Sequence, residues 1–201
     1  MSSLARPDPL EAADLLARRR RISVDDYREM SERGVLTPND RVELIDGVVV
    51  EKMTKNPPHI VATDLLDTLL RRSVPEGWFV SSGNPVLMAK FDSEPEPDLQ
   101  IVRGTPRDYL ARKHEPVDTA LVIEVADSSY GFDRRIKGKL YASSGIPVYW
   151  ILDLNRRLLE IHSDPAGDGY GLVEEFGPDS EVPIVLGGVD VARVAVREIL
   201  P

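Results

Sequence analysis

Four side chains that lie far apart in the sequence have the types needed for metal-assisted chemistry. Glu43, Asp98 and Glu124 are carboxylates, and Lys137 follows them as a cation. Carboxylate oxygens are the ligands that Mg²⁺ or Mn²⁺ prefers. A lysine close to such a site can offset negative charge on a phosphate in its transition state. The set therefore predicts hydrolysis of a phosphodiester bond by a metal-activated water.

Glu124 is the sharpest local anomaly, because it interrupts the apolar run Ala120–Val125. Burying a lone carboxylate costs several kcal/mol unless the group is paired or bound to a metal. An arginine partner at the end of the strand would also explain Glu124, and Asp98 alone would be an ordinary loop acid. Adjacent strands of one sheet can place the two acids side by side, which favours the metal interpretation.

Lys137 stands four residues after Asp133 and four before Tyr141, so all three side chains approach one face of a helix. A solvated Asp133–Lys137 pair on a surface helix would explain the same spacing. In the functional interpretation, Lys137 points across toward the acids. His59, at the expected start of another helix, is either a phosphate or proton-transfer group or an exposed polar residue.

The hydropathy pattern predicts a mixed α/β fold with a central sheet flanked by helices. Apolar runs at 120–125 and 147–152 are joined by an amphipathic helix over 133–144, and this crossover implies parallel pairing. That helix is expected to place Ile136, Leu140 and Tyr141 on its apolar face.

Other segments complete the expected sheet and its covering helices. Asp46-Gly47 between two apolar runs predicts a hairpin, which implies antiparallel pairing. The remaining expected elements are a capped helix over 23–32, a helix over 58–72, strands at 78–80, 86–88, 97–102 and 158–162, and short strands and turns over 163–201.

Composition limits the class of protein. The 201 residues are 42% hydrophobic, which is typical of one domain, expected over 23–201 after a flexible arm over 1–22. The absence of cysteine excludes disulfides, thiolate zinc sites and cysteine nucleophiles, and favours a cytoplasmic location. No apolar run is long enough to span a membrane.

Charge gives a mixed indication about nucleic acids. A net charge of −9 argues against broad nucleic-acid binding, although residues 128–162 carry six basic and three acidic groups. The surroundings of Lys137 are therefore expected to be locally basic.

The order of these motifs resembles that of the Uma-type family of bacterial restriction endonucleases, a branch of the PD-(D/E)XK nuclease superfamily. The resemblance covers about Tyr27 to Trp150, and its motifs are Arg41–Gly47, His59, Pro97-Asp98, Val122–Val125, Asp133 with Lys137 and Tyr141, and Gly145–Asp153. Each motif is weak alone, and their order makes the match specific.

The resemblance implies a restriction-endonuclease-like fold and a role for each candidate residue. Asp98 and Glu124 would be ligands of Mg²⁺ or Mn²⁺, with Glu43 as an additional acid, and Lys137 would be the catalytic lysine. The cleft would also contain the side chains of His59, Asp133 and Tyr141.

The resemblance also implies a substrate and an assembly. The substrate would be DNA, and double-strand cleavage would favour a homodimer. Hydrolysis of RNA or of a small phosphodiester stays open, as does a catalytically inactive binding or regulatory protein that keeps the fold.

One departure from the superfamily pattern concerns the lysine. Its usual place is two residues after the acid on the same strand, and Ala126 occupies that position here. Within the family resemblance, Lys137 supplies the amine from the following helix instead. Asp127 adds a further negative charge beside the expected site.

Overall fold

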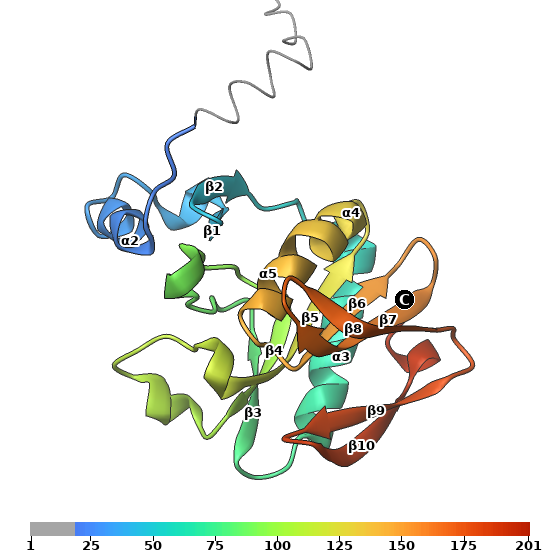
Figure 1. Ribbon diagram of the computed structural model, residues 1–201. Helices are drawn as coiled ribbons and strands as arrows, with labels where there is room; N and C mark the ends of the chain where they lie inside the picture. Colours follow the sequence, from blue (N-terminus) through green and yellow to red (C-terminus); the bar gives the residue numbers. More distant parts are fainter. Residues whose placement is uncertain (1–18) are drawn as a thin grey trace, which may run out of the picture.

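The computed structural model describes residues 19–201, so most of the predicted N-terminal arm, residues 1–18, lies outside the described residues. A six-stranded sheet with the order β3-β4-β5-β6-β7-β8 forms the centre of the fold (Figure 1). Its strands are β3 (Trp78–Ser82), β4 (Leu99–Arg103), β5 (Thr119–Ala126), β6 (Val148–Asp153), β7 (Leu158–Ala166) and β8 (Gly169–Phe176).

The pairing confirms the predicted mixed sheet. β5 and β6 are parallel, because the chain crosses over between them through α4 (Tyr130–Phe132), a π-helical turn (Asp133–Lys137) and α5 (Gly138–Ser143). The other neighbouring strands of this sheet pair antiparallel.

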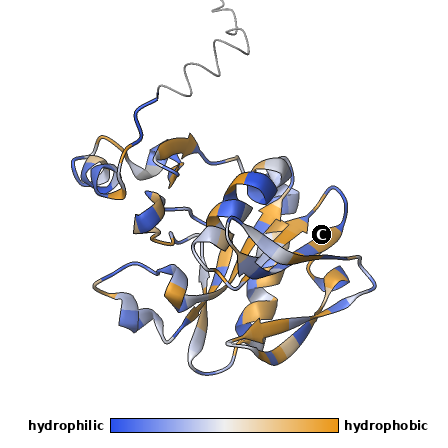
Figure 2. Cartoon of the chain, in the orientation of Figure 1, coloured by the Kyte–Doolittle hydropathy of each residue, from blue (hydrophilic) through white to orange (hydrophobic). Residues whose placement is uncertain are grey.

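Helices cover the two faces of the sheet, and alternation along β5 separates the two cores. Leu121, Ile123 and Val125 pack with α3 (Pro57–Ser73), whereas Val122 and Ala126 pack with α5. Glu124 lies two positions from both Val122 and Ala126, so its side chain points to the same face of the sheet, the one covered by α5. Figure 2 shows hydrophobic residues concentrated along these strands.

Two smaller hairpins complete the strands. β9 (Glu181–Leu186) pairs with β10 (Val189–Ala195) and joins the core on the α3 side. β1 (Val42–Ile45) pairs with β2 (Val48–Glu51), which confirms the hairpin predicted at Asp46-Gly47. Gly47 has a φ of 68°, a left-handed conformation that glycine adopts readily.

The helical elements before the sheet also follow their local signals. α2 (Val24–Glu32) begins at a capping box formed by Ser23 and Asp26, as predicted. Short 3₁₀ helices occupy Pro38–Asp40, Ala89–Phe91, Pro106–Tyr109, Pro116–Asp118 and Val196–Glu198. No helix in the described part of the chain is long and apolar enough to cross a membrane.

Two predicted strands require correction. The segment 86–88 makes only isolated bridges, because its amides alternate between two segments: Val86 and Met88 donate to Pro95 and Ser93, whereas Leu87 donates to His114. The strand predicted from Pro97 begins at Leu99 instead. Proline has no amide proton to donate to a ladder, so Asp98 sits just before the strand.

The prediction of one regular helix over 133–144 was also wrong in detail. The amide of Gly138 bonds to the carbonyl of Asp133, which defines a π turn inside the helix. The wider turn changes the phase of the residues around it, so Ile136 is 47% exposed instead of sharing the apolar face with Leu140 and Tyr141. The same turn leaves both Asp133 and Lys137 buried.

Candidate active site

A cleft of about 250 Å³ opens where the β1–β2 hairpin, the start of α3, the end of β5 and the π turn meet. Six of the seven predicted site residues line it: Glu43, His59, Asp98, Glu124, Asp133 and Lys137. The seventh, Tyr141, is completely buried and contacts Glu124 from the core. The fold thus brings together residues that are up to 94 positions apart (Glu43 to Lys137).

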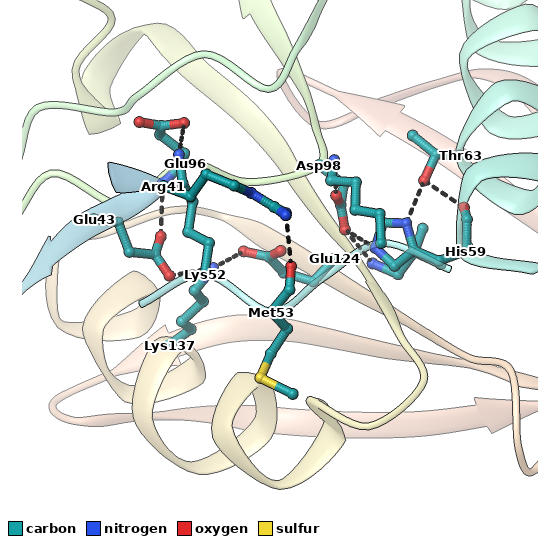
Figure 3. A network of polar contacts seen from close by, with 12 residues as sticks. Arg41, Glu43, Lys52, Met53, His59, Thr63, Glu96, Asp98, Glu124 and Lys137 are labelled. Atoms are coloured by element: carbon teal, nitrogen blue, oxygen red, sulfur yellow. Dashed lines mark hydrogen bonds and ion pairs between the residues drawn. The ribbon is translucent and has the colours of Figure 1, made fainter. Parts of the chain in front are cut away.

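Lys137 lies between two acids at the buried end of this cleft. Its Nζ is 2.9 Å from Glu124 Oε1 and 3.1 Å from Glu43 Oε1 (Figure 3). Glu43 Oε2 in turn accepts the backbone amide of Glu96 at 2.9 Å. Ala126 occupies the position at which the superfamily pattern has a lysine. Here Lys137, from the helical segment that follows β5, brings an ammonium group to the same acid, Glu124.

Two donors hold the Glu124 carboxylate through the same oxygen, Oε1. Lys137 Nζ and the Tyr141 hydroxyl, at 2.8 Å, both donate to Oε1. Among residues 19–201, no donor bonds to its Oε2. One oxygen of this buried carboxylate is therefore left to accept a ligand from the cleft.

Asp98 is positioned by the edge of β5 and by α3. Its Oδ2 accepts the Val125 amide at 2.9 Å and lies 3.1 Å from His59 Nε2, while Lys55 Nζ is 2.8 Å from Oδ1. Glu124 directly precedes Val125 on β5, so the bond to the Val125 amide fixes Asp98 beside Glu124.

His59 reaches Asp98 because of how α3 begins. The Asn56 side chain caps the helix by accepting the His59 amide at 3.1 Å, and Pro57 occupies the first helical position. The first turn of α3 therefore presents the His59 ring to Asp98, as the predicted helix start requires.

Burial and neighbouring charges give the acids different proton affinities. Burial raises the pKa of Glu124 to about 8, although Lys137 opposes the shift, and it raises the pKa of Asp133 to about 6. For Asp98, burial is outweighed by His59 and Lys55, which lower its pKa to about 2. Burial also disfavours the charge on Lys137, but Glu124, Glu43 and Asp133 outweigh it and hold the Lys137 pKa above its usual value.

The carboxylates do not form a preformed metal cage. Within residues 19–201, no three acidic or histidine side chains are grouped closely enough to hold an ion. Lys137 and Lys55 lie against the carboxylates that would be the ligands. The donor set nevertheless suits a hard divalent cation, since Glu43, Asp98 and Glu124 all present carboxylate oxygens to the same cleft.

Comparison with known proteins agrees with this geometry. The model of the Uma2 family, described as "Putative restriction endonuclease", matches residues 24–194. The chain belongs to the Uma2 family. This membership confirms the resemblance inferred from the order of the motifs. No curated protein matches the chain.

A solved structure has a similar fold. It is described as a "putative nuclease belonging to DUF820 from Anabaena variabilis ATCC 29413" and is 12% identical to this chain. The match covers 89% of this chain and 97% of that one, with a TM-score of 0.66. This likeness supports the restriction-endonuclease-like fold, with its mixed sheet flanked by helices.

Sequence reasoning missed two polar groups at the cleft of this Uma2 protein. Lys55 contacts Asp98, and Asn56, besides capping α3, donates its side-chain amide to Asp127. The available signal was the segment Lys55-Asn56-Pro57, a lysine directly before a helix cap that leads to His59. The partners of both residues are more than 40 positions away, beyond the reach of any local pattern.

The helix that carries Lys137 has a second anchor, also unpredicted. Ile151 is the register partner of both Glu124 on β5 and Glu160 on β7, so the two acids share one face of the sheet. Completely buried Glu160 accepts Arg134 Nε and the Tyr130 hydroxyl, each at 2.9 Å. Glu160 and Glu124 therefore hold the helical segment after β5 near the two ends of its π turn, through Arg134 and Lys137.

The pair of Lys137 and Glu124 should be coupled in stability. Lys137→Met leaves Glu124 and Glu43 buried without their cation, so the free energy of unfolding should fall by about 3 kcal/mol. Because Glu124→Gln removes one of the stranded charges, the double variant should lose less than the sum of the two single variants. Urea denaturation of all four proteins at pH 7 measures this cycle, and strictly additive losses would contradict the pairing.

Asp98 should stabilise the Uma2 fold in a pH-dependent way. Its folded pKa of about 2 lies below the ordinary value of 3.8, so its contribution is present above pH 4 and is lost as the pH falls toward 2. Asp98→Asn lacks this contribution. The difference in free energy of unfolding between wild type and variant should therefore shrink by about 1 kcal/mol from pH 6 to pH 3. A difference that stays constant in urea titrations over this range would argue against the assignment.

Proposed function

We propose that this Uma2 protein is an endonuclease that hydrolyses DNA phosphodiester bonds with the help of bound Mg²⁺ or Mn²⁺. One observation carries the proposal. The Lys137 ammonium is held within 3.1 Å of the buried carboxylates of Glu43 and Glu124, in a cleft that Asp98 also lines. Membership of a family described as restriction endonucleases supports the same reaction.

Asp98 and Glu124 would hold the metal, and Glu43 would be an additional acid in the site. Each is buried, each lines the cleft, and each presents hard oxygen donors. When bound, a divalent cation supplies Lewis acidity and lowers the pKa of water. Its charge would also offset the cost of burying the Glu124 carboxylate in its ionised form.

Lys137 would act on the attacking water or on the phosphate. A lysine ammonium has three N–H donors; Glu124 accepts one of them, and Glu43 forms an ion pair with the ammonium at 3.1 Å. A remaining donor can point to a water or to a phosphate oxygen, where it offsets the charge that develops during attack. The two acids fix its position, so little reorganisation is needed.

Lys55, His59 and the capping of α3 would serve the substrate side of the cleft. The His59 ring fixes Asp98 through its contact with Oδ2, and Asn56 and Pro57 fix the helix start that carries the ring. Arg41 and Lys55 line the same cleft and bring positive charge to it. Acidic side chains outnumber basic ones in the lining of this cleft, so these cations and the bound metal would have to supply the attraction for a phosphate backbone on a chain whose net charge is −9.

Plasmid nicking in Mg²⁺ or Mn²⁺ tests the proposal. Asp98→Ala and Lys137→Ala should each slow nicking by about 100-fold or more, since each removes a group that acts on the reacting phosphate. Lys139→Ala is the matched control, because Lys139 lies on the same helical segment but forms an exposed pair with Asp168. It should nick at the wild-type rate.

A folding check makes the assay decisive. Circular dichroism of each variant establishes that a loss of cleavage is not a loss of folding. Purified Asp98→Ala and Lys137→Ala proteins that both nick at the wild-type rate would refute the proposal.

A further inference from the structure

Two lysines of the cleft contact the proposed metal ligands Asp98 and Glu124, and they differ in burial. Lys137 is 7% exposed and belongs to a helix, whereas Lys55 is 46% exposed and belongs to the segment between β2 and α3. Asp98, the partner of Lys55, is itself only 8% exposed. A buried acid is therefore neutralised in part by a lysine that reaches it from the solvent side.

The oxygen that Lys55 occupies is the one that a cation from the cleft would need. Asp98 Oδ2 is already engaged by the Val125 amide and by His59 Nε2. Lys55 Nζ is 2.8 Å from the other oxygen, Oδ1. An incoming divalent cation and the Lys55 ammonium would thus compete for one carboxylate oxygen.

The backbone around Lys55 is held at both ends, while its side chain is nearly half exposed to solvent. On one side, the Lys52 amide donates to the Arg41 carbonyl at 2.8 Å. On the other, Asn56 caps α3 and bonds to Asp127. Release from Asp98 would therefore leave the Lys55 ammonium inside the cleft, within the reach of its own four-carbon stem.

We propose that Lys55 is an exchangeable cation that holds Asp98 Oδ1 in the metal-free protein, yields this oxygen to a divalent cation, and then contacts a phosphate oxygen of the nucleic-acid backbone. This inference rests on the proposed function and adds a substrate-binding residue to it. Lys137 has no such freedom, because it is buried between Glu43 and Glu124. The cleft thus contains one fixed lysine and one that changes partners.

The exchange is energetically accessible. An ion pair with a largely exposed lysine contributes little net free energy, because water solvates the released ammonium well. A divalent cation offers twice the charge to the same oxygen and can also be bound by Glu124. Once displaced, the ammonium gains a phosphate as its new anionic partner.

Binding of Mn²⁺ without DNA tests the first half of the exchange. Lys55→Met removes the competitor but keeps the length of the side chain, so the dissociation constant for Mn²⁺ measured by calorimetry should fall by about three- to fivefold, the size expected for an exposed ion pair. Lys55→Arg keeps the charge and should retain the wild-type affinity. Lys113→Met is the matched control, since Lys113 is similarly exposed and pairs with a buried acid, Glu94, outside this cleft. It should change the affinity by less than twofold.

Binding of a DNA duplex in Ca²⁺ tests the second half. Lys55→Met should weaken this binding several-fold and reduce the slope of log affinity against log salt by about one, as the loss of one phosphate contact requires. A variant that only disturbed the fold would weaken Mn²⁺ and DNA binding together. Opposite effects on the two ligands are specific to the exchange.

The failures of the two proposals can be told apart. If wild type binds Mn²⁺ and nicks plasmid, but Lys55→Met shows unchanged affinity for Mn²⁺, the exchange is wrong and the nuclease proposal stands. If neither protein binds Mn²⁺ up to millimolar concentration, both the exchange and the metal dependence are wrong. Tighter Mn²⁺ binding with unchanged DNA binding would overturn the phosphate contact.

Discussion

The arrangement of the site depends on the burial of one ammonium group between two carboxylates. Lys137 joins the β1–β2 hairpin through Glu43 to the central sheet through Glu124. Removing Lys137 would leave two carboxylates without their cation in a region with little water, which is costly. This cost explains why the helix, the hairpin and β5 meet at one point, and why the cleft forms there.

The rest of the fold keeps this group in place. Glu160 and Glu124 hold the same helical segment from two strands, and the π turn between Asp133 and Lys137 lets both of these side chains turn inward. Asp98 is placed by the Val125 amide and by the first turn of α3. The acids of the cleft are thus fixed by backbone and helix-end contacts, and the exposed Lys55 is the mobile component that we infer.

Much of this arrangement could be predicted from local patterns in the sequence. The apolar run of β5 with one acid, the Asp46-Gly47 turn and the helical spacing after Pro57 each have a local cause, and each element formed. The spacing of Asp133, Lys137 and Tyr141 indicated one shared helical face but left a solvated Asp133–Lys137 pair open, and the structure buries all three side chains.

What could not be predicted depends on contacts between distant segments. The π turn is not encoded by spacing, and it forms where the helix packs on Glu124 and Glu160, so Ile136 was assigned to the wrong face. The segment 86–88 has the composition of a strand, but its amides donate alternately to two different segments, at Ser93 and Pro95 and at His114. The Lys55–Asp98 pair spans 43 positions, and no local sequence pattern near either residue indicates its partner.

The central claim is that Asp98 and Glu124 bind a divalent cation beside Lys137. Crystals of the protein soaked in Mn²⁺, measured for anomalous scattering, test it most directly. The account predicts an anomalous peak within about 2.5 Å of carboxylate oxygens of both Asp98 and Glu124, with the Lys55 ammonium turned away from Asp98. A peak elsewhere on the chain, or no peak in this cleft at millimolar Mn²⁺, would contradict it.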